Sequence, residues 1–187
     1  KLGADELNYA SDIDVMFVAD GADQTVLERA ARRVMELSRG SFRVDANLRP
    51  QGRDGPLVRT ADSYDAYWQR WAEPWEFQAL LKAAPVAGDE QLAAEFDALR
   101  VERLWGRAFS ADDLRSLRQM KARVEAEVSR KGLTELEVKR GRGGIRDVEF
   151  SIQLLQLVHG HLDPAIRVPG TLPALAELSA AGYVDSD

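Results

Sequence analysis

The stretch KLGADELNYASDIDVMFV, residues 1 to 18, ends in a run that alternates polar and apolar side chains. Residues two apart on an extended strand point to the same face, so Asp12 and Asp14 are predicted to share one face while Ile13 and Val15 face the core. Neighbouring carboxylates repel each other unless protons or a cation intervene, and hard oxygen ligands suit Mg²⁺ or Mn²⁺. The pattern favours a metal-binding strand, with a solvated acidic strand end as the alternative.

A second alternating stretch, FRVDANLR at residues 42 to 49, supplies a third carboxylate. Its predicted faces are Phe42, Val44, Ala46 and Leu48 on one side and Arg43, Asp45, Asn47 and Arg49 on the other. Between the two stretches a helix is predicted from a cap at Asp23 to about residue 39, which makes a strand–helix–strand unit. Its apolar face is expected to hold Leu27, Ala30, Ala31, Val34 and Leu37. Three aspartates on two adjacent strands are the arrangement that two-metal phosphoryl or nucleotidyl transfer needs.

Candidate phosphate ligands flank these acids. Gly3 allows a backbone to approach a phosphate closely, and Ser11 is able to donate a hydrogen bond to one. The segment RPQGRDGPLVR, residues 49 to 59, is too rich in Gly, Pro and Arg for regular structure and predicts a loop beside the acids. The guanidinium forks of Arg49 and Arg59 match phosphate oxygens. The alternative for each arginine is a surface ion pair with a nearby aspartate.

Helices are predicted for most of the remaining chain. The expected ranges are 61 to 72, 74 to 84, 89 to 107, 111 to 130, 145 to 157 and 172 to 181. The aromatic residues between 64 and 77 recur at spacings of three and four, which is more typical of a core than of an adenine platform. The segment PVAGD, residues 85 to 89, predicts a hinge between domains.

Several polar residues on these helices keep two interpretations. Glu76 and Lys82 either position a substrate or form ion pairs. Asp147 and Glu149 either stabilise the start of their helix through its dipole or reach a cleft. The glycine-rich turn at 141 to 144 either presents backbone N–H groups to an anion or is a simple tight connection. The helix after this turn is expected to be buried around most of its circumference, and Thr171 is expected to cap the last helix.

Composition narrows the possible functions. The 187 residues contain 25 basic and 31 acidic side chains, a net charge of −6, which argues against a nucleic-acid partner held by general phosphate attraction. With no cysteine the chain has neither disulfides nor thiol chemistry, in agreement with a reducing cytoplasm. No apolar run reaches the roughly 20 residues of a membrane-spanning helix, so no membrane partner is expected. The start at Lys1, inside a motif, indicates an excised fragment.

Four long motifs, in this order, resemble the glutamine synthetase adenylyltransferase/adenylyl-removing enzymes. They are KLGADELNYASDID at residues 1 to 14, VDANLRPQGRDGPLVRT at 44 to 60, WEFQALLKAAPVAGD at 75 to 89 and GRGGIRDVEFSIQLLQLVHG at 141 to 160. The resemblance implies an α/β (α+β) fold: a DNA polymerase β-like nucleotidyltransferase domain at 1 to 85, then a helical bundle at 86 to 187. It places the catalytic, metal-binding acids on Asp12, Asp14 and Asp45, with two Mg²⁺ ions or Mn²⁺. One departure is Gly3-Ala4, where many members of the wider superfamily have Gly-Gly or Gly-Ser.

The resemblance also implies a substrate. Glutamine synthetase is the expected protein partner, with ATP, ADP and phosphate as small ligands and the PII signal protein as a partner of the full-length enzyme. ELNYASDID and GGIRDVEF are closer to the N-terminal, adenylyl-removing half, in which inorganic phosphate attacks the AMP phosphorus and releases ADP. The alternatives are the adenylylating half, which transfers AMP from ATP, a uridylyltransferase of the PII protein, and a non-catalytic nucleotide-sensing module.

Overall fold

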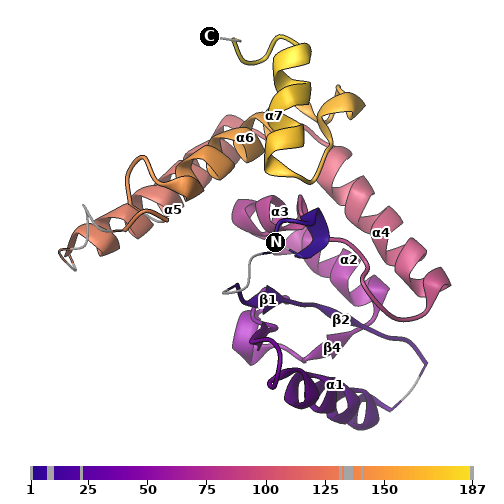
Figure 1. Ribbon diagram of the computed structural model, residues 1–187. Helices are drawn as coiled ribbons and strands as arrows, with labels where there is room; N and C mark the ends of the chain where they lie inside the picture. The colour runs from indigo at the N-terminus through magenta and orange to yellow at the C-terminus, as the bar shows by residue number, and fades with distance from the viewer. Residues whose placement is uncertain are drawn as a thin grey trace. The chain divides into compact units, whose positions relative to one another are not determined.

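A computed structural model describes residues 2–7, 11–21, 23–130, 132, 137–139 and 141–185, so Lys1 and residues 8–10 of the opening stretch lie outside it. The described chain is a mixture of helices and short parallel strands, as expected for an α/β protein. It forms two compact units, Lys1–Arg103 and Leu104–Asp187. The first carries all the described strands and the second is helical (Figure 1).

The first unit begins with the predicted strand–helix–strand arrangement. Strand β1 (Ile13–Asp14) leads through helix α1 (Gln24–Ser38) to β3 (Val44–Asp45), which pairs with β1 in parallel. Parallel neighbours need such a crossover, and a helix usually provides it. The side chain of Asp23 caps α1, as predicted, because one carboxylate oxygen accepts hydrogen bonds from the first free N–H groups of the helix.

The single strand expected at the end of the stretch from residue 1 to residue 18 is divided. After β1, the chain continues as β2 (Phe17–Val18), which pairs in parallel with β4 (Val58–Arg59). Strands β3 and β4 therefore pair with successive parts of one extended segment, residues 13–18. A loop from residue 46 to residue 57, which contains the short 3₁₀ turn Gly52–Asp54, connects β3 to β4. The loop interrupts the sheet without disturbing the alternation of side chains along the segment.

A small core joins α1 to one face of these strands. Its buried members are Ala31, Ala46, Leu57 and Val58, with Val15, Phe17, Ala19, Leu27 and Met35 packed around them. The predicted apolar face of α1 was partly wrong, because Val34 and Leu37 are 51% and 66% exposed. A sheet of two-residue strands offers a narrow surface, and the single row at 27, 31 and 35, spaced by four residues, suffices to cover it.

Helices α2 (Ala61–Arg70), α3 (Pro74–Leu80) and α4 (Glu90–Trp105) lie on the side of the strands opposite α1 (Figure 1). Tyr64 is fully buried and packs edge-on against Phe96, with ring centroids 5.2 Å apart, while Trp68 lies 5.4 Å from Phe96. The expected aromatic core is thus present, although Trp71 at the end of α2 is exposed.

This packing explains why the first compact unit extends past the expected hinge at 85 to 89. Phe96 of α4 packs against Tyr64 and Trp68 of α2, so the two helices share one core. The first compact unit therefore includes α4 as far as Arg103. The domain limits 1 to 85 and 86 to 187, which describe functional parts, stay a prediction.

An ion pair between α2 and α4 is predicted to make the stability of the first unit depend on pH. Arg103 donates to both carboxylate oxygens of Asp65, at 2.5 and 3.2 Å, which lowers the pKa of Asp65. We expect Asp65→Asn to reduce the free energy of unfolding near pH 7 by about 1 kcal/mol. A lowered folded-state pKa stabilises the protein fully above the unfolded-state pKa, so the difference from wild type should begin to shrink near about pH 4 and disappear as the pH falls through the lower folded-state pKa.

Urea unfolding of this chain at several pH values measures the effect. Asp20→Asn is the matched control, because Asp20 is an exposed acid in a loop of the same unit. A difference between wild type and Asp65→Asn that stays constant down to pH 3 would show that the pair does not contribute through its charge.

The second unit contains α5 (Ala111–Arg130), α6 (Ile145–His159), the turn Pro164–Ile166 and α7 (Thr171–Ala180). Ile152, Ile166, Ala174 and Leu178 form its buried core. Two expectations were wrong here. Burial around α6 begins only at Phe150, since Ile145 and Val148 are 69% and 53% exposed, and Gly170 rather than Thr171 occupies the capping position of α7. In the part of the chain that the structure describes, no helix is both long and apolar enough to cross a membrane.

Candidate active site

The carboxylate face of the first strand is present as predicted. Asp12, Asp14, Met16 and Val18 line a pocket, which Val15 also borders. Ile13 is buried, and Val15 and Phe17 are partly buried against the core beneath α1. Alternation along an extended segment produces this division, because successive side chains point to opposite faces. Apart from Val15, which contacts both the core and the pocket, the segment has one side in the core and one open, acidic side.

Two pairs of residues share this acidic face across the parallel strands. Asp14 is in register with Asp45, and side chains of residues in register lie on the same face. Two residues earlier on each strand, Asp12 meets Arg43, whose guanidinium binds both carboxylate oxygens, with Nη2 2.7 Å from Oδ2. The bonds to Asp12 raise the pKa of Arg43. The face thus carries three acids and one arginine that neutralises the first of them.

A magnesium or manganese ion needs several oxygen ligands close together. Within the described ranges, no group of three or more His, Cys, Asp or Glu side chains is close enough together to hold a metal. Asp45 accepts a hydrogen bond of 2.7 Å from the backbone N–H of Asn47, and Asp12 is bound by Arg43. The donor chemistry nevertheless suits a hard cation, since Asp14 and Asp45 are carboxylates in register on one face.

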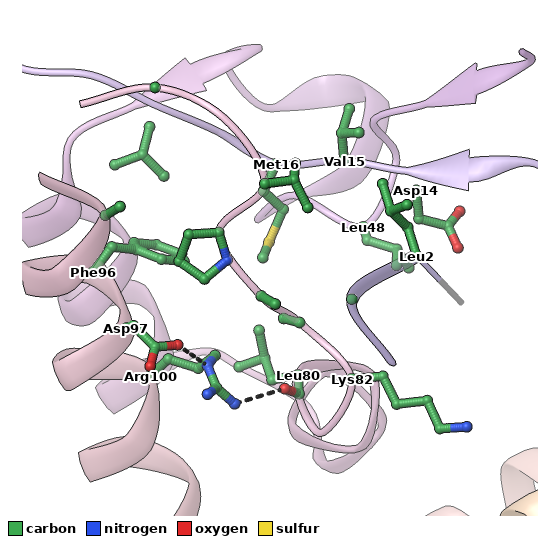
Figure 2. Close-up of a pocket in the computed structure, with 18 of the residues that line it drawn as sticks. Leu2, Asp14, Val15, Met16, Leu48, Leu80, Lys82, Phe96, Asp97 and Arg100 are labelled. Atoms are coloured by element: carbon green, nitrogen blue, oxygen red, sulfur yellow. Dashed lines mark hydrogen bonds and ion pairs between the residues drawn. The ribbon is translucent and has the colours of Figure 1, made fainter. Parts of the chain in front are cut away.

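The pocket beside the acids is mostly apolar and lies within the first unit. Figure 2 shows Leu2 and Asp14 at one end and Phe96, Asp97 and Arg100 of α4 at the other. Arg100 is held by Asp97 and by the carbonyl oxygen of Leu80, at 2.8 and 3.1 Å, which fixes the end of α3 to α4. An apolar pocket with a few charged groups at its ends is typical of a small-molecule site.

Gly3 lies in the 3₁₀ turn Leu2–Ala4, and its backbone contacts the segment that follows α3. A Cβ atom on Gly3 would be 2.4 Å from the carbonyl oxygen of Lys82 and 2.9 Å from the backbone nitrogen of Ala84. The position therefore needs a glycine for this close approach, whatever its part in binding phosphate. Both the turn and the segment after α3 line the pocket.

Lys82 and Glu76 have structural partners. The Lys82 ammonium lies 2.6 Å from a Glu6 oxygen, and the Lys82 side chain is only 5% exposed. An ion pair is therefore present, but it is a long-range pair with a buried lysine and not the intrahelical or surface pair that was expected. Glu76 was expected to form an ion pair as well, and this was wrong. Its Oε1 accepts hydrogen bonds of 3.0 Å from the hydroxyl of Tyr67 and from the backbone N–H of Glu73, which starts α3. Burial raises the pKa of Glu76.

The arginines of the 49 to 59 loop support that loop. The guanidinium of Arg49 donates to three backbone carbonyls, those of Ala46, Gly55 and Arg53, at 2.7, 3.1 and 3.4 Å. Arg59 donates to Ser63 and Gln51, and its Nε is buried with no hydrogen-bond partner in the described chain. The alternative interpretation of each arginine was a surface ion pair with a nearby aspartate. Among the described residues, neither Arg49 nor Arg59 forms such a pair. Ser11 is partly buried immediately before Asp12.

The glycine-rich turn before α6 is closed by its own helix. Asp147 accepts a hydrogen bond of 2.7 Å from the backbone N–H of Gly143 and lies 3.0 Å from the ammonium of Lys121 on α5. These contacts lower the pKa of Asp147. A Cβ on Gly144 would be 2.7 Å from the carbonyl of Val138, so the turn is a tight connection, one of its two interpretations.

The residue that sequence reasoning missed is Arg43. It was placed on the polar face with Asp45, but no partner was assigned to it. The signal that was available is its position two residues before Asp45, which matches the position of Asp12 two residues before Asp14. A parallel register that pairs the two later acids necessarily pairs the two earlier residues.

Comparison with known proteins gives two family matches, and both families are nucleotidyltransferases by name. Residues 1–99 match the glutamate-ammonia ligase adenylyltransferase family, and residues 118–187 match the GlnD PII-uridylyltransferase family. The first match covers more than half of the chain. The chain belongs to the glutamate-ammonia ligase adenylyltransferase family.

Curated relatives agree with this assignment over nearly the whole chain. The bifunctional glutamine synthetase adenylyltransferase/adenylyl-removing enzyme of Nocardia farcinica is 48% identical over 187 residues, which is 100% of this chain and 18% of that protein. Proteins of the same name from Streptomyces avermitilis and Mycobacterium tuberculosis are 48% and 47% identical over 98% of this chain. The chain spans 20% and 18% of their lengths. These matches confirm the family resemblance found in the four motifs.

Proposed function

We propose that this chain is the N-terminal, adenylyl-removing nucleotidyltransferase half of such an enzyme, with a DNA polymerase β-like domain followed by a helical bundle. Its substrate is the adenylylated tyrosine of glutamine synthetase, the protein named in its relatives. The observation that carries the proposal is that Asp12 and Asp14 line an apolar pocket within one compact unit, with Asp45 in register with Asp14 on the neighbouring strand. A cytoplasmic location is part of the proposal, and the cysteine-free sequence agrees with it.

In the proposed reaction, an oxygen of inorganic phosphate forms a bond to the AMP phosphorus while the bond from phosphorus to the tyrosine oxygen breaks. The tyrosine oxygen takes a proton, and the products are ADP and unmodified tyrosine. Asp12, Asp14 and Asp45 would hold two Mg²⁺ ions, or Mn²⁺, which when bound neutralise charge on the transferred phosphoryl group. Met16, Leu80 and Phe96 offer an apolar surface for the adenine.

Phosphate binding by Gly3, Ser11, Arg49 and Arg59 belongs to the same proposal. Gly3 lines the pocket, and Ser11 directly precedes Asp12. The bond from Arg49 to the carbonyl of Ala46 holds this arginine next to the strand that carries Asp45, and Arg59, on β4, bonds to the same loop at Gln51. An oriented guanidinium loses little entropy when it binds an anion, so a supporting role and a phosphate-binding role are compatible.

The direction of the reaction is tested in a protein of the relatives' full length that carries this chain, with its other catalytic centre inactivated. We expect it to release ADP from adenylylated glutamine synthetase only when inorganic phosphate is present. With ATP and unmodified glutamine synthetase it should release no pyrophosphate. Pyrophosphate release together with no ADP would instead identify the adenylylating half.

The PII protein is proposed as a partner of the full-length enzyme and not of this chain alone. The match of residues 118–187 to a PII-uridylyltransferase family favours one alternative function, uridylyl transfer to PII. Incubating the same protein with UTP and PII and measuring uridylylated PII by mass spectrometry separates the two. Labelled PII would support the alternative, and unlabelled PII with ADP release would support adenylyl removal.

A further inference from the structure

The ion pair between Arg43 and Asp12 lies directly beside the proposed metal site. Arg43 precedes Asp45 by two residues, and Asp12 precedes Asp14 by two, so the ion pair and the acid pair are successive positions on one face. Both nitrogens that Arg43 uses, Nε and Nη2, bind oxygens of the same carboxylate. A bidentate pair of this kind leaves Asp12 with little capacity to coordinate another cation.

The Arg43 guanidinium and a divalent cation would therefore compete for the carboxylate of Asp12. The negative charge of Asp45 also attracts Arg43 toward the acidic face. Without a cation, three clustered carboxylates would repel one another, and the guanidinium reduces that repulsion. With a divalent cation bound, the same guanidinium would add repulsion of like charges.

The solvent exposure of Arg43 and Asp12 indicates that a cation is able to replace Arg43 as the partner of Asp12. The side chain of Arg43 is 79% exposed and that of Asp12 is 38% exposed. Exposed ion pairs contribute little to stability and are weakened by salt, so solvent and a cation are able to displace the arginine. The hydrogen bonds of the Arg43 guanidinium within the described chain all go to Asp12, so a move away from Asp12 breaks no other hydrogen bond of that group there.

We propose that Arg43 is a built-in competitor of the metal ion. It neutralises Asp12 in the metal-free protein and must release this carboxylate before a divalent cation acquires its third ligand. Arg43 thereby sets the concentration of Mg²⁺ or Mn²⁺ at which the site fills. This inference rests on the metal site of the proposed function.

Manganese binding to the 187-residue chain, measured from the electron paramagnetic resonance signal of free Mn²⁺, tests the inference without a substrate. We expect Arg43→Gln to bind Mn²⁺ more tightly, with half-saturation at a concentration up to about fivefold lower than for wild type. Arg43→Lys keeps the charge and loses the fork, and should fall between the two. Arg39→Gln removes a charge from another exposed arginine that lines the same groove as Arg43, and should shift half-saturation less than Arg43→Gln does.

Asp14→Asn distinguishes failure of the inference from failure of the metal site. If Asp14→Asn loses Mn²⁺ binding but Arg43→Gln binds no more tightly than wild type, the competitor role of Arg43 is wrong while the metal site stands. If Asp14→Asn binds Mn²⁺ as well as wild type, the metal site itself is wrong. A shift in Arg39→Gln as large as that in Arg43→Gln would reduce the effect to general charge and overturn the inference.

Discussion

Replacing Asp14 by Asn should lower the rate of ADP release from adenylylated glutamine synthetase by at least about a hundredfold. Asp14 shares a face with Asp45 and lines the pocket, so its loss removes a ligand of the proposed metal site. The fold should be unaffected, because Asp14 is exposed and its removal relieves repulsion between carboxylates. The rate is measured in a protein of the relatives' full length, and stability by urea unfolding of this chain.

Asp20→Asn serves as the control, because Asp20 is an exposed acid six residues further along the same segment and does not line the pocket. It should keep the wild-type rate. If Asp14→Asn kept near-normal activity at limiting magnesium, the assignment of Asp14 as a metal ligand would have to be abandoned.

Gly3→Ala should reduce the free energy of unfolding by about 1 to 3 kcal/mol. The new Cβ would lie 2.4 Å from the Lys82 carbonyl and 2.9 Å from the Ala84 nitrogen, and both are backbone atoms that cannot rotate away. The opening turn would have to separate from the segment after α3, which exposes one wall of the pocket. Gly40→Ala is the matched control, since no atom lies within 4 Å of the added Cβ. Equal stabilities of the two variants would mean that the turn is not packed as described.

The local elements of this chain were largely predictable from sequence. Alternation along the first strand identified the face of Asp12 and Asp14, and helix periodicity placed α1, α4 and α5 to within two residues. These features depend on neighbours in sequence, which set side-chain direction and helix capping.

Contacts between distant residues were not predictable in the same way. Glu6 and Lys82 are 76 residues apart, and only the folded chain brings them together. The aromatic spacing predicted a core, but the packing of Phe96 on α2, which places α4 in the first unit, depends on a tertiary contact. Arg43 is intermediate, because its contact follows from a strand register that the sequence did not reveal.

The loop between β3 and β4 has a consequence for how this enzyme family is able to vary. The acid pair is fixed before the loop begins and β4 resumes pairing after it ends, while Arg49 binds the loop to itself through three backbone carbonyls. The loop is therefore a self-contained segment whose two ends are held by the flanking strands. Residues inserted or replaced near its tip should alter what approaches the acids from that side while the spacing of the carboxylates stays the same.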